Sequence, residues 1–144
     1  MTPTHTPTKR VFDLLATRHE QVRRANERIW NEQESVHLSN SEWYVLAQIY
    51  GAQPTIADVT RGVHISRQAT HKLIHNLNAK GLVTIFPHPT RRKDKCVALT
   101  TFGMNCYERN EALKAQLEEN IEATIGKEAM AALRDLLQRD WNLT

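Results

Sequence analysis

The sequence predicts a mainly helical protein with one small two-stranded β-hairpin. Apolar residues recur at the helical period of about 3.6 residues along most of the 144-residue chain, and the period changes to two only between residues 82 and 99. All five glycines lie at or near the expected element boundaries, and all five prolines lie outside the expected helices. This length suits one domain with additional arms.

The first expected helix runs from Lys9 to about Val36. It contains neither Gly nor Pro, and its apolar residues, such as Phe12 and Leu15, form only a thin stripe that arginines interrupt. Because a small domain would not bury such a helix, we expect it to pack against a second subunit. Residues 1–8 are rich in Thr and Pro, lack the apolar core of a secretory signal, and are expected to be disordered.

Two shorter helices are expected next, each beginning with a capping box. In this motif a Ser or Thr side chain accepts from the backbone N–H three residues later, where an acidic side chain reaches back. Ser39 and Glu42 have this spacing at the start of the second helix, which we expect to end at Gly51. Thr55 and Asp58 have the same spacing at the start of the third helix.

A fourth helix follows after a tight connection. We expect the third helix to end at Gly62, and residues 63–65 then lead directly to Ser66, a favourable N-cap residue. Gly81 stands where the fourth helix would end in the left-handed conformation. A short helix, a tight turn and a longer helix with a polar outer face form the order of a helix-turn-helix.

The fourth helix has an apolar side and a polar side. At about 100° per residue, the apolar side carries Ala69, Leu73, Leu77 and the stem of Lys80, with Thr70 and Ile74 at its edge. The polar side has Lys, His and Gln but no acid; Arg and Gln can pair with purine edges, and Lys suits phosphates. We therefore expect DNA contacts here, a solvated helix face being the alternative. The expected contact residues are Ser66, Arg67, Gln68, Thr70, His71, Lys72 and His75.

A β-hairpin with a basic tip is expected directly behind this helix. Residues 82–86 alternate like a strand, Pro87 is expected to stop it because proline lacks an N–H donor, and residues 96–99 form the return strand. Such a hairpin is a wing, whose tip can reach a minor groove or the phosphates beside it. The expected wing contacts are Arg91, Arg92 and Lys93; a solvated loop is the alternative.

Two terminal helices complete the chain. The first begins after Thr100 or Thr101 and runs to about Ile125, and the second runs from about Lys127 to Trp141. Their narrow apolar seams are better explained by two chains that interleave their ends than by one core. The expected domains are a disordered lead at 1–8, dimerisation helices at 9–36 and 101–144, and a winged helix-turn-helix DNA-binding domain at 37–100.

Positive charge is concentrated in the middle of the chain. Residues 61–95 contain eight Lys and Arg against one acid, a net charge of +7, whereas the rest of the chain carries −4. A basic centre between acidic arms is typical of a module that binds a polyanion. The apolar runs are too short to span a bilayer, so we expect no membrane partner and a cytoplasmic location.

The remaining candidate sites favour neither a metal centre nor an enzyme. Cys96 and Cys106 lack the spacing of zinc ligands, and we expect two small buried or half-buried thiols, with a redox switch as the alternative. His71 and His75 are spaced for chelation, but they lie on the face assigned to DNA, so no metal or cofactor is expected.

No catalytic set is expected either. The nearest acid–base candidates are Glu34, His37 and Asp58, and no motif joins them to a nucleophile or a phosphate-binding loop. Among non-enzymes, a winged helix that binds only proteins is a rival, and salt-sensitive retention on DNA would distinguish the two classes.

Five motifs, in this order and spacing, resemble the MarR family of winged helix-turn-helix transcriptional regulators: Leu38-Ser39-x-x-x-Trp43-x-Val45-Leu46, Ile65-Ser66-Arg67-Gln68-Ala69-Thr70, Leu77-x-Ala79-Lys80-Gly81-Leu82-Val83, Pro89-x-x-Arg92 and Leu99-Thr100-x-x-Gly103. The resemblance covers residues 38–103 closely and the terminal helices by pattern only. It implies a homodimer formed by the terminal helices, a recognition helix at 66–80 in the major groove and a wing at 87–95.

The wing tip departs from the family pattern at one residue. Arg92 stands at the family's wing-tip arginine, but Arg91 precedes it where the family usually has an acid. The ion pair that holds the wing is therefore expected to be missing or rebuilt with Asp94.

The resemblance further implies a dimeric, sequence-specific DNA-binding regulator, a repressor of a palindromic operator that a small-molecule effector releases. The two recognition helices would lie about 34–36 Å apart, one turn of DNA. A small aromatic or lipophilic effector would bind between the dimer helices and the DNA-reading domain. Metal or thiol sensing on the same fold is the alternative. Candidate pocket residues, which core packing would equally explain, are Trp30, His37, Trp43 and Tyr44.

Overall fold

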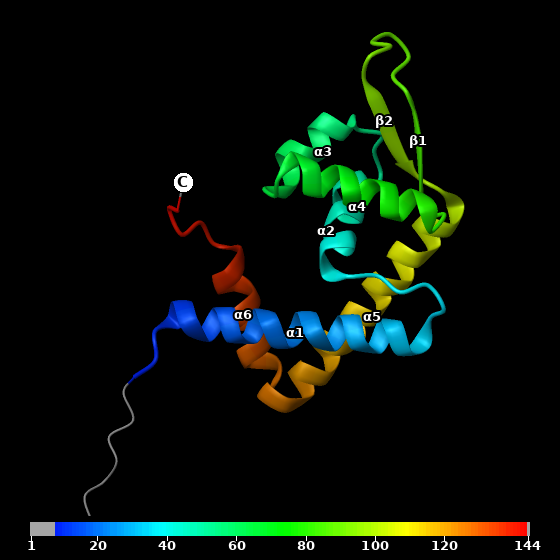
Figure 1. The fold of residues 1–144 in the computed structure, drawn as a ribbon. Coiled ribbons are helices and arrows are strands. Elements are labelled where there is room, and N and C mark those ends of the chain that lie inside the picture. Colours follow the sequence, from blue (N-terminus) through cyan, green and yellow to red (C-terminus); the bar gives the residue numbers. More distant parts are fainter. Residues whose placement is uncertain (1–7, 144) are drawn as a thin grey trace, which may run out of the picture.

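Six helices and one two-stranded sheet make up the computed structural model, which describes residues 8–143 (Figure 1). The helices are α1 Val11–Gln33, α2 Asn40–Ile49, α3 Ile56–Val63, α4 Arg67–Ala79, α5 Thr101–Ile125 and α6 Lys127–Gln138, and the strands are β1 Val83–Pro87 and β2 Lys95–Leu99. This is a winged helix-turn-helix with long terminal helices, as expected. All of the expected lead except its last residue lies outside the described residues. Within residues 8–143, no helix has the length and apolar content needed to cross a membrane.

The helix starts follow the capping signals of the sequence. Both expected capping boxes are confirmed: the hydroxyls of Ser39 and Thr55 accept from the N–H groups of Glu42 and Asp58, whose carboxylates accept in return. The Thr100 hydroxyl accepts from the Gly103 N–H and so caps α5. Each cap satisfies donors that a helix cannot pair internally, which is why the starts can be read locally.

Four expected element ends are wrong. Helix α1 ends at Gln33 instead of about Val36, whose carbonyl accepts from the Trp30 indole at 3.0 Å. Helix α3 continues through Gly62 to Val63, and His64 ends it with a left-handed φ of 53°. Helix α6 stops at Gln138, and the Trp141 indole folds back to donate to the Leu136 carbonyl at 2.7 Å, which satisfies a group at the helix end. Pro87 closes β1 instead of following it, since a terminal position tolerates the missing N–H.

The core lies where α2, α3 and α4 meet the base of the hairpin and one end of α1. Strand β1 pairs antiparallel with β2, with Val83 opposite Leu99 and Ile85 opposite Val97. The Trp30 and Trp43 rings meet edge to face at 4.8 Å between centroids. The largest fully buried side chains are Trp30, Leu38, Leu46, Ile49, Ile74, Leu77, Leu82, Val45, Val59, Val63, Val83 and Val97.

Candidate nucleic-acid interface

Helix α4 presents its polar side to solvent and its apolar side to the core. The Ser66 hydroxyl accepts from the Ala69 N–H at 3.1 Å and so starts the helix. Thr70, Ile74 and Leu77 are fully buried, whereas Ala69 and Leu73 are only half-buried. The buried side of α4 is therefore rotated about the helix axis relative to the expected one. It centres on Thr70 and Ile74, which were expected at the edge of the apolar side. The side chains that remain accessible are Ser66, Arg67, Gln68, Lys72 and His75, with His71 half-buried.

Thr70 is the one expected DNA contact on α4 that the structure contradicts. Its side chain has no exposed surface, and its hydroxyl donates to the Ser66 carbonyl at 3.0 Å. A hydroxyl satisfied inside the helix and sealed by the core cannot reach a base or phosphate. Its position at the edge of the predicted apolar side left its burial undecided, and the packing of α4 on α2 and α3 settles it.

The far end of α4 is anchored by a lysine whose role was not expected. The Lys80 ammonium group donates to both carboxylate oxygens of Glu42, at 2.7 and 2.9 Å, and to the His37 carbonyl at 2.8 Å. The Glu42 side chain is only 8% exposed. A buried carboxylate needs such a partner, so Lys80 fixes the end of α4 to the connection between α1 and α2.

The wing is fixed at its base to the start of α3. The Val97 N–H donates to the Pro54 carbonyl at 2.9 Å, and Thr55 forms a bridge with Cys96. Hydrogen bonding with the backbone and side chain of Thr55 lowers the pKa of Asp58 in the same region. The hairpin therefore leaves the core in a defined direction, and Figure 1 shows it projecting beyond α3 and α4.

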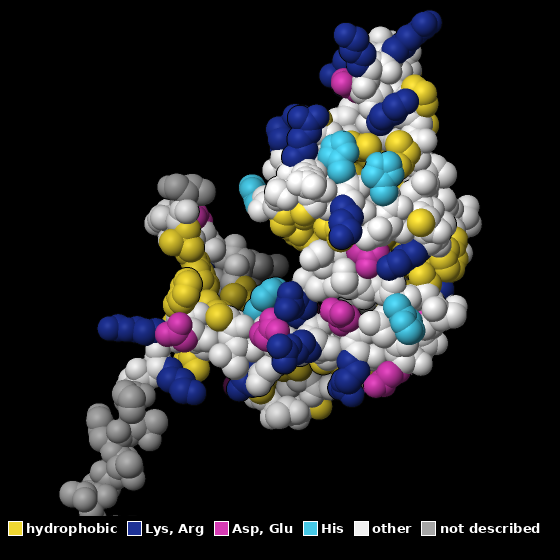
Figure 2. All heavy atoms as spheres, viewed as in Figure 1, with side chains coloured by type: hydrophobic (Ala, Val, Ile, Leu, Met, Phe, Trp, Pro, Cys, Tyr) yellow, Lys and Arg dark blue, Asp and Glu magenta, His cyan; other side chains and the backbone are white. Residues whose placement is uncertain are grey.

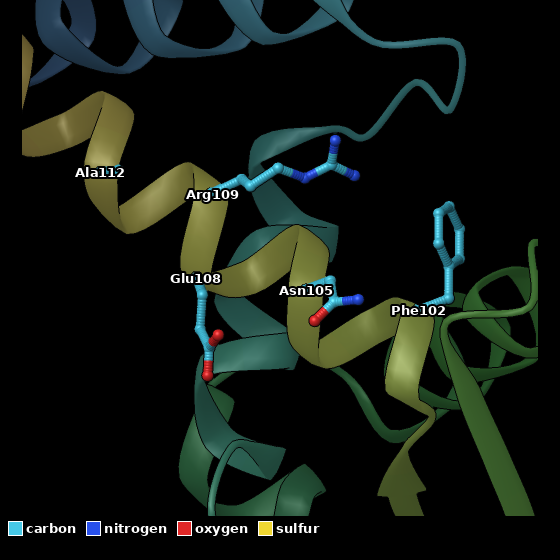
Figure 3. A pocket seen from close by; sticks show the side chains of 5 residues that line it. All are labelled: Phe102, Asn105, Glu108, Arg109 and Ala112. Atoms are coloured by element: carbon cyan, nitrogen blue, oxygen red, sulfur yellow. The ribbon is translucent and has the colours of Figure 1, made fainter.

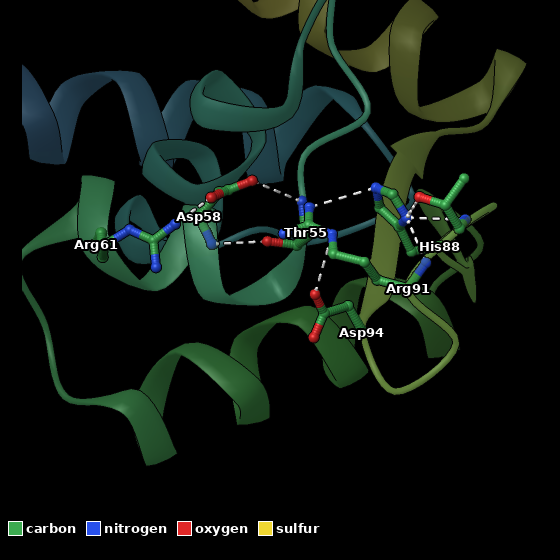
Figure 4. A network of polar contacts seen from close by, with 7 residues as sticks. Thr55, Asp58, Arg61, His88, Arg91 and Asp94 are labelled. Carbon is green, nitrogen blue, oxygen red and sulfur yellow. Dashed lines mark hydrogen bonds and ion pairs between the residues drawn. The ribbon is translucent and has the colours of Figure 1, made fainter.

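The wing tip is a closed turn with two arginines in different roles. The Asp94 N–H donates to the Arg91 carbonyl at 2.9 Å, which makes a turn with Arg92 and Lys93 at its two central positions. Arg91 pairs instead with Asp94, whose carboxylate oxygen lies 3.5 Å from the Arg91 Nε (Figure 4). The ion pair of the wing is thus rebuilt with Asp94, one of the two outcomes expected.

Most of the basic side chains of residues 61–95 remain unpaired. Three of the eight form ion pairs: Arg61 with Asp58, Lys80 with Glu42, and Arg91 with Asp94. Over residues 8–143, no ion pair involves the other five, Arg67, Lys72, Arg92, Lys93 and Lys95. Figure 2 shows Lys, Arg and His side chains gathered over α4 and the wing.

Neither cysteine forms a disulfide, and both are buried, as expected. Burial raises the pKa of the Cys106 thiol, which the nearby Arg109 guanidinium only partly offsets. A protonated, buried thiol is a poor nucleophile, so the geometry does not favour thiol sensing. Within the described part of the chain, no group of three or more His, Cys, Asp or Glu side chains is arranged to hold a metal ion.

The structure divides the four expected effector-pocket residues between the core and the surface. Trp30 and Trp43 belong to the core, whereas Tyr44 is 43% exposed and His37 is exposed as well. The Trp30 indole donates to the Val36 carbonyl at 3.0 Å, a purely internal contact. Trp30 and Trp43 therefore reflect core packing, the alternative that their apolar character left open, whereas Tyr44 does not.

An open hollow of about 560 Å³ lies instead along α5. In Figure 3 the Arg109, Asn105 and Phe102 side chains extend from α5 on the side of α1 and the α1–α2 connection. Arg109 donates to both carboxylate oxygens of Glu34, at 3.0 and 3.1 Å, and its guanidinium lies 5.7 Å from the centre of the Trp30 ring. The residues that line the hollow are Phe102, Asn105, Glu108, Arg109 and Ala112.

Comparisons with known proteins give one consistent result. Residues 38–94 match the model described as MarR family. The reduced form of MarR from E. coli is 20% identical, with a TM-score of 0.82 over 92% of this chain and 97% of that one. A mutant E. coli MarR complexed with operator DNA is 21% identical, with a TM-score of 0.73 over 89% and 91%. NadR in complex with 4-hydroxyphenylacetate is 20% identical, with a TM-score of 0.67 over 94% and 95%. No curated protein matches the chain.

Proposed function

Residues 38–94 of this chain match the MarR family model, and on that ground we propose that the protein is a dimeric, sequence-specific DNA-binding transcriptional repressor. One observation carries the proposal: accessible basic side chains that form no ion pair within residues 8–143 lie on the outer side of α4 and at the wing tip. A surface that is basic and almost free of acidic side chains is complementary to the negatively charged backbone of duplex DNA.

Helix α4 would enter the major groove and the wing would contact the neighbouring backbone. Arg67 and Gln68 stand in the first turn of α4, the part of a recognition helix that reaches base edges. Lys72 suits a phosphate, and Arg92 and Lys93 extend from the wing turn. The same fold in a mutant MarR complexed with operator DNA supports this arrangement.

A homodimer would place two recognition helices on one face of a palindromic operator. The support lies in the terminal helices and the residues that follow α6, which leave many large apolar side chains exposed on one chain: Val11, Phe12, Leu14, Val22, Ile125, Leu133, Leu136, Leu137, Trp141 and Leu143. Apolar surface of this extent is typical of an interface between subunits.

We expect Arg92→Ala to weaken binding to operator and random DNA by a similar factor and to reduce the salt dependence of binding. Arg92 occupies a wing turn and would contact phosphate, so each lost contact should lower the slope of log K against log salt by about one. Fluorescence anisotropy at several salt concentrations measures this slope.

Arg28→Ala is the matched control for this experiment. Arg28 is exposed on α1, away from α4 and the wing, and the substitution removes the same charge. Its slope should equal that of the unmodified protein. An unchanged slope for Arg92→Ala would exclude the wing contact, and an absence of salt-sensitive binding in all variants would favour a protein-interaction module.

The proposed effector is a small aromatic acid that binds in the hollow on α5. Phe102 offers an apolar surface and Arg109 a guanidinium that is half exposed, and NadR is similar in fold and holds 4-hydroxyphenylacetate. A ligand there would contact α5 and the Arg109 guanidinium, which is bonded to Glu34 at the end of α1, and could shift the spacing of the recognition helices. Titration of a DNA complex with aromatic carboxylic acids, on the unmodified protein and on Arg109→Gln, tests this site.

A further inference from the structure

The imidazole ring of His88 lies inside the loop that joins the two wing strands (Figure 4). Its Nδ1 accepts from the backbone N–H groups of Thr90 and Arg91, at 3.2 and 3.0 Å, and the Thr90 hydroxyl lies 3.3 Å from the same nitrogen. The backbone N–H of His88 donates to the Asp94 carbonyl at 2.9 Å. The half-buried ring therefore organises the residues that lead into the wing turn.

These contacts determine which nitrogen of the ring carries hydrogen. Two backbone donors point at Nδ1, so this nitrogen must be an unprotonated acceptor, and the single hydrogen of a neutral imidazole lies on Nε2. The Arg91 guanidinium lies 3.3 Å from Nε2, so the contact brings two donors together and is not a hydrogen bond. A cation thus stands beside the ring.

The charged groups around the ring do not compensate for a positive charge on it. Within residues 8–143, no carboxylate is hydrogen-bonded to the ring; Asp94 pairs with Arg91 at 3.5 Å. Asp58 at the start of α3 interacts electrostatically with Arg91 and is already paired with Arg61. Protonation at Nδ1 would direct a third donor at two N–H groups and add a second cation beside Arg91.

We propose that neutral His88 is a positioning residue of the wing, and that its protonation opens the wing turn and withdraws Arg92 and Lys93 from DNA. Histidine changes charge between about pH 5 and 8, so the wing would be ordered at neutral pH and released in acid. The effect on DNA rests on the function proposed above, whereas the effect on the turn does not.

The sign of this pH response sets it apart from ordinary electrostatics. His71 and His75 lie on the outer side of α4, where added positive charge would tighten binding to a polyanion. His88 is expected to act in the opposite direction, through geometry. Variants at His88 alone can therefore separate the two contributions.

Two substitutions make a matched pair. His88→Asn keeps an acceptor, because an Asn side-chain oxygen commonly accepts from backbone N–H groups two or three residues later, and it cannot titrate. His88→Ala removes the acceptor at every pH. Either variant retains the buried core, since the loop lies outside it.

Nuclear magnetic resonance on the full chain tests the turn without DNA. At pH 7.5 the His88 nitrogen shifts should show hydrogen on Nε2, and on acidification the amide signals of Thr90 and Arg91 should move together with the ring. In His88→Asn these two amide signals should not follow that titration. Hydrogen on Nδ1 at pH 7.5, or Thr90 and Arg91 signals indifferent to the ring, would overturn the proposal.

Binding to a random DNA duplex, measured by anisotropy at constant ionic strength, tests the consequence. At pH 7.5 His88→Asn should bind like the unmodified protein, and His88→Ala about fivefold more weakly, the worth of one or two hydrogen bonds. At pH 5.5 the unmodified protein should fall about fivefold below His88→Asn. A ratio between these two that stays constant with pH would refute the proposal for DNA. If no variant bound DNA, the proposed function would fail, while the resonance experiment would still decide the role of His88.

Discussion

At the scale of single residues, the charges on and around α4 have three separate uses. Lys80 has a structural role, because its ammonium group pairs with the buried Glu42 carboxylate and donates to the His37 carbonyl. Arg91 stabilises the wing turn through its ion pair with Asp94. Arg92 has no ion-pair partner within residues 8–143 and is exposed at the turn. Position along the chain did not distinguish these uses, and the surroundings of each side chain do.

We expect Lys80→Met to lower the free energy of unfolding by about 2 kcal/mol, because it leaves the buried Glu42 carboxylate without a charged partner. Lys72→Met removes the same charge from an exposed position of α4 and should change it by less than about 0.5 kcal/mol. Urea unfolding measures both variants. Adding Glu42→Gln to Lys80→Met should recover part of the loss, and equal stability of the two single variants would contradict the anchor.

At the scale of elements, the end of α4 and the start of α5 are joined by a compact junction. The Thr100 hydroxyl donates to the Gly81 carbonyl at 2.7 Å and accepts from the Gly103 N–H at 2.9 Å. The Thr100 N–H donates to the Leu82 carbonyl at 3.0 Å. Gly81 itself has a φ of 79°, which favours glycine. The junction makes the recognition helix, the base of the wing and the first part of α5 one body.

Gly103 is the tightest point of this junction, since a Cβ there would overlap the Leu82 carbonyl oxygen. Gly103→Ala should therefore lower the free energy of unfolding by about 3 kcal/mol, because neither backbone can give way without breaking the junction. Asn105→Ala, at an exposed position of the same helix, serves as the control and should be nearly neutral. Thermal unfolding measures the stability of both variants. A Gly103→Ala protein as stable as the Asn105→Ala control would show that α5 can move away from the Leu82 carbonyl.

At the scale of the whole molecule, the terminal helices are weakly held by their own chain. Helix α1 has 23 residues but only Trp30 is buried, and α6 has only Met130 buried. In Figure 1 the start of α1 and α6 lie at the same end of the molecule, away from the wing. The buried core belongs mainly to the middle of the chain, so the arms are suited to a partner subunit.

We expect Leu136→Glu to convert the protein to a monomer at micromolar concentration and to weaken operator binding by roughly tenfold or more, because the two half-sites would no longer be held together. Leu136 is half exposed on α6, where a partner would cover it. Gln138→Glu adds the same charge to the same helix without removing an apolar side chain, and should remain dimeric. Analytical ultracentrifugation measures the oligomeric state, and a dimeric Leu136→Glu protein would contradict the proposed interface.

Local chemistry explains the features that could be predicted before the fold was known. The capping boxes at Ser39 and Thr55, the cap at Ser66, and the change of period at the wing each depend on residues within a few positions of one another. The helix order, the hairpin and the basic centre could therefore be read directly. The polar side of α4 and the basic centre already predicted DNA binding, and the family motifs strengthened that expectation and set Arg92 apart from Arg91.

Which polar side chains remain available for DNA depends on how the elements pack in three dimensions. Thr70 is buried in the core, Lys80 is paired with Glu42, and Arg91 is paired with Asp94. Trp30 and Trp43 fill the interior instead of lining a pocket. Glu42 and Lys80 are far apart along the chain, and the rotation of α4 about its axis depends on how α2, α3 and the hairpin pack together. The free energy of burying or pairing a group depends on all of its neighbours in space, which no local pattern contains.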